Sequence, residues 1–329
     1  MSVLFGLRFD FRNPDFAGTT HAERYAAALE MAAWADRLGC VSIAVSEHHT
    51  SPDGYIPSPM LLASAIAART QQLYISLAAA LLPFYDPIRL AEDMNVLDII
   101  SGGRVSYVFG IGYRPEEFEQ YGLDMKQRGH IAEEKLQLLL QARTGEPFVY
   151  EGRRIHITPP PVTPGGPAIS WGGGSIAAAK RAGRYGLGFL AQSNLPGMRE
   201  AYEESCREHG YEPGMIQLPS HDTPTTMFVA DDVDKAWDEI GEYILHDVKM
   251  YGAWNPGDET TASISHAQTV DELRATSPAH KIYSTDEAAE MVRNGGMLML
   301  MPLCGGIPPE IAWPYLEHVA NVVLPRAQE

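Results

Sequence analysis

The sequence predicts an α/β fold of the (β/α)8 TIM barrel type with insertions. Eight apolar segments with the character of strands alternate with helical segments along the 329 residues. Alternation of this length fits either a closed barrel or a doubly wound open sheet. Unusual clusters rich in glycine, alanine or histidine follow five of the strands, and a barrel gathers the segments after all its strands at one mouth. These clusters favour the barrel.

The first four strand–helix units follow one another closely. Strands are expected at 3–9, 41–45, 74–80 and 105–109, and the second and third are mainly apolar, as buried parallel strands are. Helices are expected at 21–38, 58–69, 87–100 and 130–143. Gly39 ends the first of these helices, and Ser101-Gly102-Gly103 ends the third. Half of a barrel is therefore placed before residue 144.

The second half continues the alternation and carries two insertions, near 144–167 and 252–282. Strands are expected at 168–171, 187–191, 227–230 and 297–301, and helices at 174–185, 197–209, 232–251, 285–293 and 309–323. The first insertion contains an expected hairpin at 148–157. The segment 252–280 is polar and aperiodic, and we expect it to pack over one end of the barrel. The chain, 1–329, is thus predicted to form one domain.

The composition of the chain limits the kinds of molecule that it is expected to bind. The formal net charge of −17 argues against a nucleic-acid groove or an anionic membrane surface and favours a small-molecule ligand. The cysteines, Cys40, Cys206 and Cys304, are never spaced as CxxC, which argues against a disulfide framework or structural zinc. The sequence shows neither a basic leader nor an apolar run of about 18 residues. We expect a cytoplasmic protein.

Two adjacent histidines follow the second predicted strand. His48 and His49 stand beside Glu47, and a histidine there can act as an acid, a base or a hydrogen-bond donor near neutral pH. Neighbouring residues of a strand point to opposite faces, so only one of the two can face the pocket. The favoured candidate is His48. A metal site is the poorer hypothesis, because barrel metal sites draw separated ligands from several strands.

A glycine-rich turn precedes the fifth predicted helix. The backbone N–H groups of Gly173 and Gly174 and the hydroxyl of Ser175 could hold a phosphate at the positive end of that helix. Ser175 could equally serve as the helix N-cap, and the two roles are compatible. Gly110-Ile111-Gly112 lacks a third glycine and a following helix, so it suits close approach of a flat ligand. Arg114 and Arg128 are candidate local cations, or solvated surface residues.

Several ordered motifs resemble the bacterial luciferase-like monooxygenase family, which consists of (β/α)8 barrels that use a flavin or a deazaflavin. The resemblance extends over essentially the whole chain. It rests on four segments: Val45 to His49, Asp86 to Arg104, Gly110 to Phe118, and the glycine turn with Lys180 to Gly183.

The resemblance implies roles for individual residues. His48 falls at the catalytic histidine position, beside the reactive edge of the isoalloxazine ring. Ala78 and Ala79 match the family's non-prolyl cis peptide, which bulges toward the ring face. Gly110 matches a small residue packed against the flavin. Gly173, Gly174 and Ser175 match the phosphate-binding turn. Where luciferase carries a phosphate-binding arginine the chain has Ile111, and Arg128 lies about one position from the second such arginine.

By this resemblance, the implied activity is that of a monooxygenase. Reduced FMN, supplied by a separate flavin reductase, would capture O2 as a C4a-peroxyflavin and oxygenate a small organic substrate. The alternative within the family is hydride transfer with reduced F420. A non-catalytic flavin-binding partner subunit and a metal-dependent hydrolase are further alternatives, in that order. The resemblance also implies a homodimer.

Overall fold

The central feature of the fold is one parallel sheet. The computed structural model describes residues 5–220 and 222–328, so residues 3 and 4 of the first predicted strand lie outside the described residues. The eight predicted strands form, in chain order, β1 (Phe5–Phe9), β2 (Ser42–Val45), β3 (Tyr74–Leu81), β4 (Val105–Gly110), β7 (Ala168–Gly173), β8 (Gly188–Ala191), β10 (Thr226–Ala230) and β12 (Leu298–Leu300).

The order of these strands distinguishes a barrel from a doubly wound sheet. They neighbour one another as β10-β12-β1-β2-β3-β4-β7-β8, and every pairing between them is parallel. This is the chain order taken cyclically, starting at the seventh strand. A doubly wound sheet reverses its order at a switch point, whereas a barrel does not. The barrel prediction is confirmed.

Two short strands that the sequence did not predict lie at the ends of the hydrogen-bonded ladder. β9 (Ile216–Gln217) pairs with β8, and β11 (His280–Ser284) pairs with β10. Both therefore border the sixth and seventh barrel strands, where the circle of eight would close. β9 has only two residues, which is too short to give a recognisable alternation.

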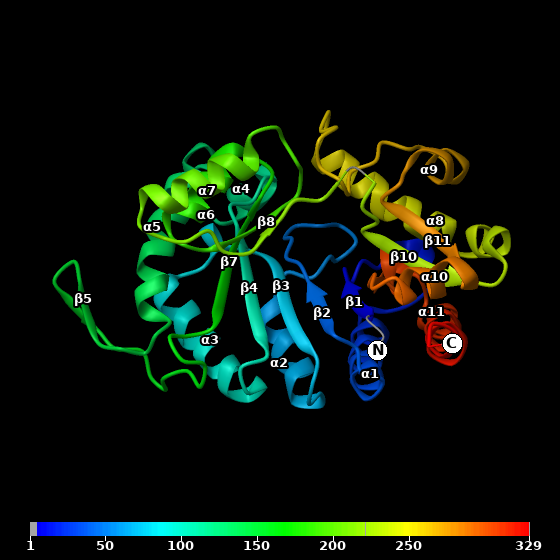
Figure 1. Cartoon of the computed structure of the whole chain (residues 1–329), viewed down its shortest axis with the longest axis horizontal. Coiled ribbons are helices and arrows are strands. Elements are labelled where there is room, and N and C mark those ends of the chain that lie inside the picture. Colours follow the sequence, from blue (N-terminus) through cyan, green and yellow to red (C-terminus); the bar gives the residue numbers. More distant parts are fainter. Residues whose placement is uncertain (1–4, 221, 329) are drawn as a thin grey trace.

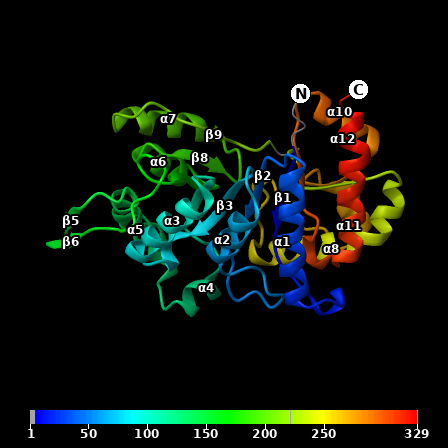
Figure 2. The same cartoon turned by 90° about the horizontal axis from the view of Figure 1, so that it is seen from below.

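The helices surround the strands, as Figures 1 and 2 show. Helix α11 contacts α1, α1 contacts α2, α2 contacts α3, and α3 contacts α5. Their bounds are α1 (His21–Arg37), α2 (Pro59–Arg69), α3 (Pro87–Ser101), α5 (Arg128–Ala142), α6 (Ile176–Arg184), α7 (Met198–Glu208), α8 (Val233–Trp254), α10 (Thr285–Arg293) and α11 (Pro309–His318). The predicted final helix continues from α11 as the π-helical segment Val319–Val323 and α12 (Leu324–Arg326).

Local signals explain where these helices begin and end. Thr20 and Glu23 form a capping box at the start of α1, and the Asp86 carboxylate caps α3, which opens on Pro87. Gly102 ends α3 with φ of +65°, a conformation that glycine adopts without a steric penalty.

The two insertions differ in structure. The predicted hairpin forms from β5 (Phe148–Tyr150) and β6 (Arg153–Ile155), which pair antiparallel and project from the barrel in Figure 1. The segment 252–280 is not wholly irregular, because α8 extends to Trp254 and α9 (Val270–Thr276) forms within it. The Ala262 N–H donates to the Gln192 carbonyl at 3.0 Å. This insertion therefore packs beside the carboxyl end of β8, as expected for an excursion over one end of the barrel.

A short helix also corrects the interpretation of the glycines after β4. Helix α4 (Pro115–Gln120) begins three residues after Gly112, where no helix was expected. Its six residues are too few to show a hydrophobic period.

Among the described residues, no helix combines the length and the apolar character needed to cross a membrane.

Helices α6 and α7 pack so closely that glycine is required between them. A Cβ atom placed on Gly183 of α6 would lie 2.5 Å from the Tyr202 carbonyl oxygen and 2.8 Å from the Cys206 nitrogen. We expect Gly183→Ala to force the helices apart and to lower the free energy of unfolding by about 1–3 kcal/mol. Thermal unfolding followed by circular dichroism will measure this. The control is Ala177→Ser, at an exposed position of the same helix, and an equal loss in both variants would contradict the packing argument.

Candidate active site

The predicted site residues lie at the carboxyl ends of four neighbouring strands. Glu47, His48 and His49 follow β2, the Ala78–Ala79 bond lies near the end of β3, Gly110 ends β4, and Gly173 ends β7. Since β2, β3, β4 and β7 are adjacent and parallel, these ends share one edge of the sheet. The fold thus gathers residues that are separated by more than 120 positions in the sequence.

His48 is buried, and both of its ring nitrogens have partners. Nδ1 lies 3.0 Å from Glu117 Oε1, and Nε2 lies 3.1 Å from the Tyr113 hydroxyl. Burial lowers the pKa of His48, and the neighbouring Glu117 carboxylate offsets only part of that effect. The imidazole is consequently neutral at pH 7, with one nitrogen as donor and the other as acceptor.

Aromatic rings surround the His48 imidazole. The Trp254 ring centroid lies 4.7 Å from it and the Tyr55 centroid 5.0 Å, and the rings of Tyr113 and Tyr251 lie within 6 Å. Trp254 and Tyr251 come from the last turn of α8, at the edge of the second predicted insertion. This aromatic cluster shields His48 from water and brings the seventh barrel unit against the second.

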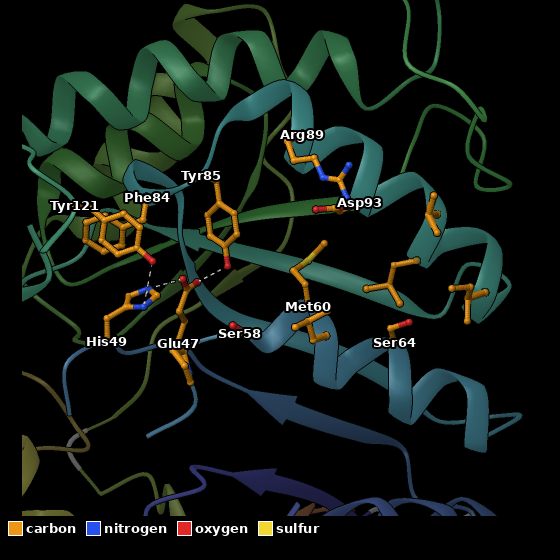
Figure 3. A pocket seen from close by; sticks show the side chains of 15 residues that line it. Glu47, His49, Ser58, Met60, Ser64, Phe84, Tyr85, Arg89, Asp93 and Tyr121 are labelled. Atoms are coloured by element: carbon orange, nitrogen blue, oxygen red, sulfur yellow. Dashed lines mark hydrogen bonds and ion pairs between the residues drawn. The ribbon is translucent and has the colours of Figure 1, made fainter. Parts of the chain in front are cut away.

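His49 lies beyond the end of β2 and turns away from this cluster. Its Nε2 lies 2.8 Å from Glu47 Oε1, and its Nδ1 lies 3.4 Å from the Tyr121 hydroxyl. Glu47 also accepts hydrogen bonds from the Leu81 N–H and the Tyr85 hydroxyl, both at 2.9 Å. Burial raises the pKa of Glu47. Figure 3 shows Glu47 and His49 at one end of a cavity of about 460 Å³ between α2 and α3, outside the barrel mouth.

The end of β3 carries the expected non-prolyl cis peptide between Ala78 and Ala79. The pairing of β3 with β4 shifts register here, which marks a bulge, and Ser46 Oγ donates to the Ala78 carbonyl at 2.8 Å. Gly110 faces this bulge, since a Cβ atom placed on Gly110 would come 3.4 Å from Ala79 Cβ. The bulge and the bare backbone opposite it suit the close approach of a flat ring.

The glycine-rich turn at the end of β7 leads directly into helix α6. Gly173 has φ of +147°, and a Cβ atom placed on it would lie 2.8 Å from Ala178 Cβ. Ser175 is the N-cap of α6, with its Oγ accepting from the Ala178 N–H at 3.2 Å, which confirms the capping role. The hydroxyl hydrogen and the first N–H groups of α6 remain suited to an anion.

Arg128 lies close to that helix. It begins α5, and the next residue, Gly129, accepts a hydrogen bond from Arg181 of α6 at 3.5 Å. Arg128 Nη1 donates to the Met125 carbonyl, whereas its Nε is buried without a partner among the described residues. An unpartnered buried guanidinium nitrogen is costly, and an anionic ligand group would satisfy it. The residues present therefore fit a phosphate-bearing cofactor.

Arg114, the other candidate cation, is not a surface residue. Its guanidinium is buried, lies 3.3 Å from Glu117 and donates to the His49 carbonyl. The guanidinium carbon is 4.1 Å from the Trp254 ring centroid, a cation–π geometry. Arg114 therefore belongs to the packing around His48 and does not reach the glycine turn.

Sequence reasoning missed a fully buried charged residue of the site. Arg12, two residues after Asp10, pairs with Asp247 at 2.6 Å and with Asp53 at 2.8 Å, and its guanidinium carbon lies 4.5 Å from the Trp254 ring centroid. Its partners come from the second and seventh units, so no sequence spacing could have revealed the pairing. Tyr113 and Glu117 were also assigned no role, although both lie in the recognised segment from Gly110 to Phe118.

One cluster deserves comparison with a metal site, because Asp10, Asp247 and Cys304 place ligand-type atoms within 4.8 Å of one another. Asp10 accepts hydrogen bonds from the backbone N–H groups of Arg12 and Gly305, and Asp247 pairs with Arg12. Burial, together with the Asp247 charge, raises the pKa of Asp10 to about 6. These partners explain the two carboxylates as structural groups, so the cluster gives no support to a metal-dependent hydrolase.

Comparison with known proteins agrees with this geometry. The model of the luciferase-like monooxygenase family matches residues 5–298, and the chain belongs to that family. Among curated relatives, limonene 1,2-monooxygenase of Rhodococcus erythropolis is 27% identical over 193 residues, covering 53% of this chain and 47% of that protein. The y4wF protein of Sinorhizobium fredii is 35% identical over 160 residues, covering 49% of this chain and 46% of that protein. The chain thus aligns with about half the length of these relatives.

Solved structures match over nearly the whole chain. The monooxygenase RslO1 of Streptomyces bottropensis has a TM-score of 0.77 at 22% identity, covering 98% of this chain and 99% of its own. The oxygenating constituent of 3,6-diketocamphane monooxygenase of Pseudomonas putida, solved with FMN, has a TM-score of 0.69 at 22% identity, covering 99% of both chains. An F420-dependent secondary alcohol dehydrogenase has a TM-score of 0.64 at 17% identity, covering 100% of both chains. These likenesses establish the fold.

The double ion pair of Arg12 leads to a prediction about stability. Arg12→Met would leave the carboxylates of Asp53 and Asp247 buried without their cation, and we expect it to lower the free energy of unfolding by about 3–5 kcal/mol. Arg89→Met is the matched control, because Arg89 also pairs with two carboxylates, Glu92 and Asp93, but its side chain is 71% exposed. Chemical denaturation will measure both variants, and equal losses would contradict the role given to burial.

The same pair predicts a pH dependence. Although burial alone would raise the pKa of Asp53, hydrogen bonding from His246 and the charge of Arg12 hold it well below its usual range. The stability that this carboxylate contributes is therefore complete above its unfolded pKa of about 3.9 and is lost as the pH falls toward the lower folded value. Denaturation curves between pH 5 and pH 2 should be less steeply pH-dependent for Arg12→Met than for the wild type.

Proposed function

We propose that this protein is a flavin-dependent monooxygenase that uses reduced FMN and O2 to oxygenate a small organic substrate. The observation that carries the proposal is the bulge at Ala78–Ala79 opposite Gly110, on the same sheet edge as His48 and the glycine turn. The FMN-containing structure of the diketocamphane monooxygenase constituent supports this choice at the level of the fold.

The chain's own residues divide the work between two ends of the cofactor. Ala78, Ala79 and Gly110 would support the flat ring, and Gly173, Gly174, Ser175 and Arg128 would hold the phosphate. Reduced FMN, when bound, supplies the electrons that activate O2. His48, kept neutral by burial, would take part in proton transfer at this site. A separate reductase would deliver the reduced flavin to this cytoplasmic protein.

The alternative on the same fold is hydride transfer with F420, the cofactor of the structurally similar secondary alcohol dehydrogenase. At Ile111 the chain has an aliphatic side chain where luciferase carries a phosphate-binding arginine, so this position does not distinguish the two cofactors. Both cofactors join a phosphate group to a flat ring through a sugar-alcohol chain, so a direct comparison of their binding is needed.

The cofactor assignment predicts a specific effect of Arg128. In anaerobic titrations we expect reduced FMN to bind more tightly than reduced riboflavin, which lacks the phosphate. Arg128→Met should weaken FMN binding about tenfold, the effect of one charge-assisted contact, and leave riboflavin unchanged. Arg199→Met, which removes an exposed arginine of α7, is the control.

Exposure of the titrated protein to air then tests the reaction. Oxygen consumption with reduced FMN supports the monooxygenase. Preference for F420 without a reaction with O2 would replace it by hydride transfer, and flavin binding without accelerated turnover would indicate a non-catalytic subunit. Binding of neither cofactor would contradict the flavin site itself.

We also propose that the protein forms a homodimer through α2 and α3. Leu61 is 75% exposed, and Val96, Ile99 and Ile100 are also exposed, so the two contacting helices present an apolar surface around the cavity of Figure 3. A patch of this kind on adjacent helices is typical of an interface, and a second copy can cover it symmetrically.

A charge at the centre of this surface should dissociate the dimer. Leu61→Glu would bury an unpaired carboxylate in the interface, so we expect a monomer in sedimentation-velocity experiments at micromolar concentration. Val149→Glu is the control, because Val149 is 70% exposed but lies on the projecting β5–β6 hairpin. A wild-type protein that sediments as a monomer would contradict the proposal.

A further inference from the structure

The surroundings of His48 leave its imidazole little direct access to a substrate. Only 7% of its side chain is exposed, and both ring nitrogens already have protein partners. Aromatic rings from three elements pack around it: Tyr55 after β2, Tyr113 after β4, and Tyr251 and Trp254 on α8. An acid–base role for His48 must therefore pass through one of its two hydrogen-bonded partners.

The direction of the two hydrogen bonds follows from their chemistry. Glu117 Oε1 also accepts the His49 N–H at 3.0 Å and pairs with Arg114, contacts that a carboxylate makes. A carboxylate only accepts, so His48 Nδ1 carries the hydrogen. In the neutral imidazole Nε2 is then the acceptor, and the Tyr113 hydroxyl donates to it at 3.1 Å. The chain of hydrogen bonds therefore runs from the Tyr113 phenol through the His48 imidazole to the Glu117 carboxylate.

Of the two partners, Tyr113 is the more exposed and lies closer in the chain to the predicted ring site. Glu117 is fully buried, whereas Tyr113 is half-buried. Tyr113 follows Gly110 by three residues, and Gly110 faces the Ala79 bulge. Gly112, with φ of +74°, allows the tight turn between them.

We propose that Tyr113 is the catalytic residue that exchanges a proton with the reacting oxygen of the substrate, and that His48 and Glu117 are positioning residues behind it. This inference rests on the proposed function, because it assigns the proton path of the same site. A proton leaving the reacting O–H group moves to the Tyr113 oxygen while the Tyr113 proton moves to His48 Nε2. The imidazolium keeps its Nδ1 hydrogen on Glu117. The reverse movement returns the proton, and no electrons are transferred.

The charged groups near the relay are compatible with this transfer. Glu117 from α4 stabilises an imidazolium, while Arg12 after β1 and Arg114 before α4 oppose it. Each arginine is itself paired with carboxylates, Arg12 with Asp53 and Asp247 and Arg114 with Glu117. Burial raises the pKa of Tyr251, so its hydroxyl keeps its hydrogen at pH 7 and contributes only a dipole.

Nitrogen NMR of the cofactor-free protein tests the relay independently of any activity. We expect the His48 ring, assigned through His48→Gln, to carry its hydrogen on Nδ1. Tyr113→Phe should then shift mainly the Nε2 resonance, and Glu117→Gln mainly the Nδ1 resonance. Tyr121→Phe is the matched control, because its hydroxyl contacts His49 and not His48. A hydrogen on Nε2, or no response to Tyr113→Phe, would overturn the proposal.

The kinetic test uses the FMN-loaded protein. We expect Tyr113→Phe to lower the rate of oxygen consumption about 100-fold, within the usual range for loss of an acid–base group, and to leave FMN affinity within about threefold. Tyr121→Phe should retain the wild-type rate. Full activity in Tyr113→Phe with none in His48→Gln would show direct action by the histidine and overturn the relay. A wild-type protein that binds no flavin would instead refute the proposed function, and the NMR result would still decide the relay.

Discussion

The double ion pair of Arg12 is the interaction on which the arrangement of the barrel mouth depends. It joins the segment after β1 to Asp53 in the segment after β2 and to Asp247 in α8. A cation with no exposed surface needs both partners, because a single unpaired charge at this depth would cost several kcal/mol. The pairing fixes the last turns of α8 against the second unit. Tyr251 and Trp254 are thereby held over His48.

Glu117 is the second residue that organises the site, and it lies on the other side of the two histidines. One oxygen of its carboxylate accepts hydrogen bonds from His48 Nδ1 and from the His49 N–H. The same oxygen forms an ion pair with Arg114. The helix that carries Glu117 is only six residues long, so these contacts, more than helical propensity, hold it in place. The same contacts select the tautomer of His48 and orient the two histidines toward different environments, one in the barrel mouth and one beside the cavity between α2 and α3.

Much of the fold could be predicted because apolar parallel strands and capped helices are encoded locally. All eight barrel strands and the β5–β6 hairpin lie where the sequence places them, within a few residues at each end. The elements that were missed, β9, β11, α4 and α9, are short and are stabilised by neighbours distant in the sequence. The motifs also placed His48, Gly110, Gly173 and Ser175 at strand ends on one edge. Their functional roles remain predictions, as does the cytoplasmic location.

By itself, then, the sequence determined the order of strands and helices, the family, and which strand ends carry unusual residues, because each of these depends on neighbours within about ten positions. Only the tertiary structure decided what surrounds the candidate histidine. Arg12, Asp53 and Asp247 are separated by up to 235 positions, and Tyr113 and Trp254 meet at His48 from different barrel units. Such contacts arise from the order of the strands in the parallel sheet, which brings together side chains whose sequence positions carry no common period.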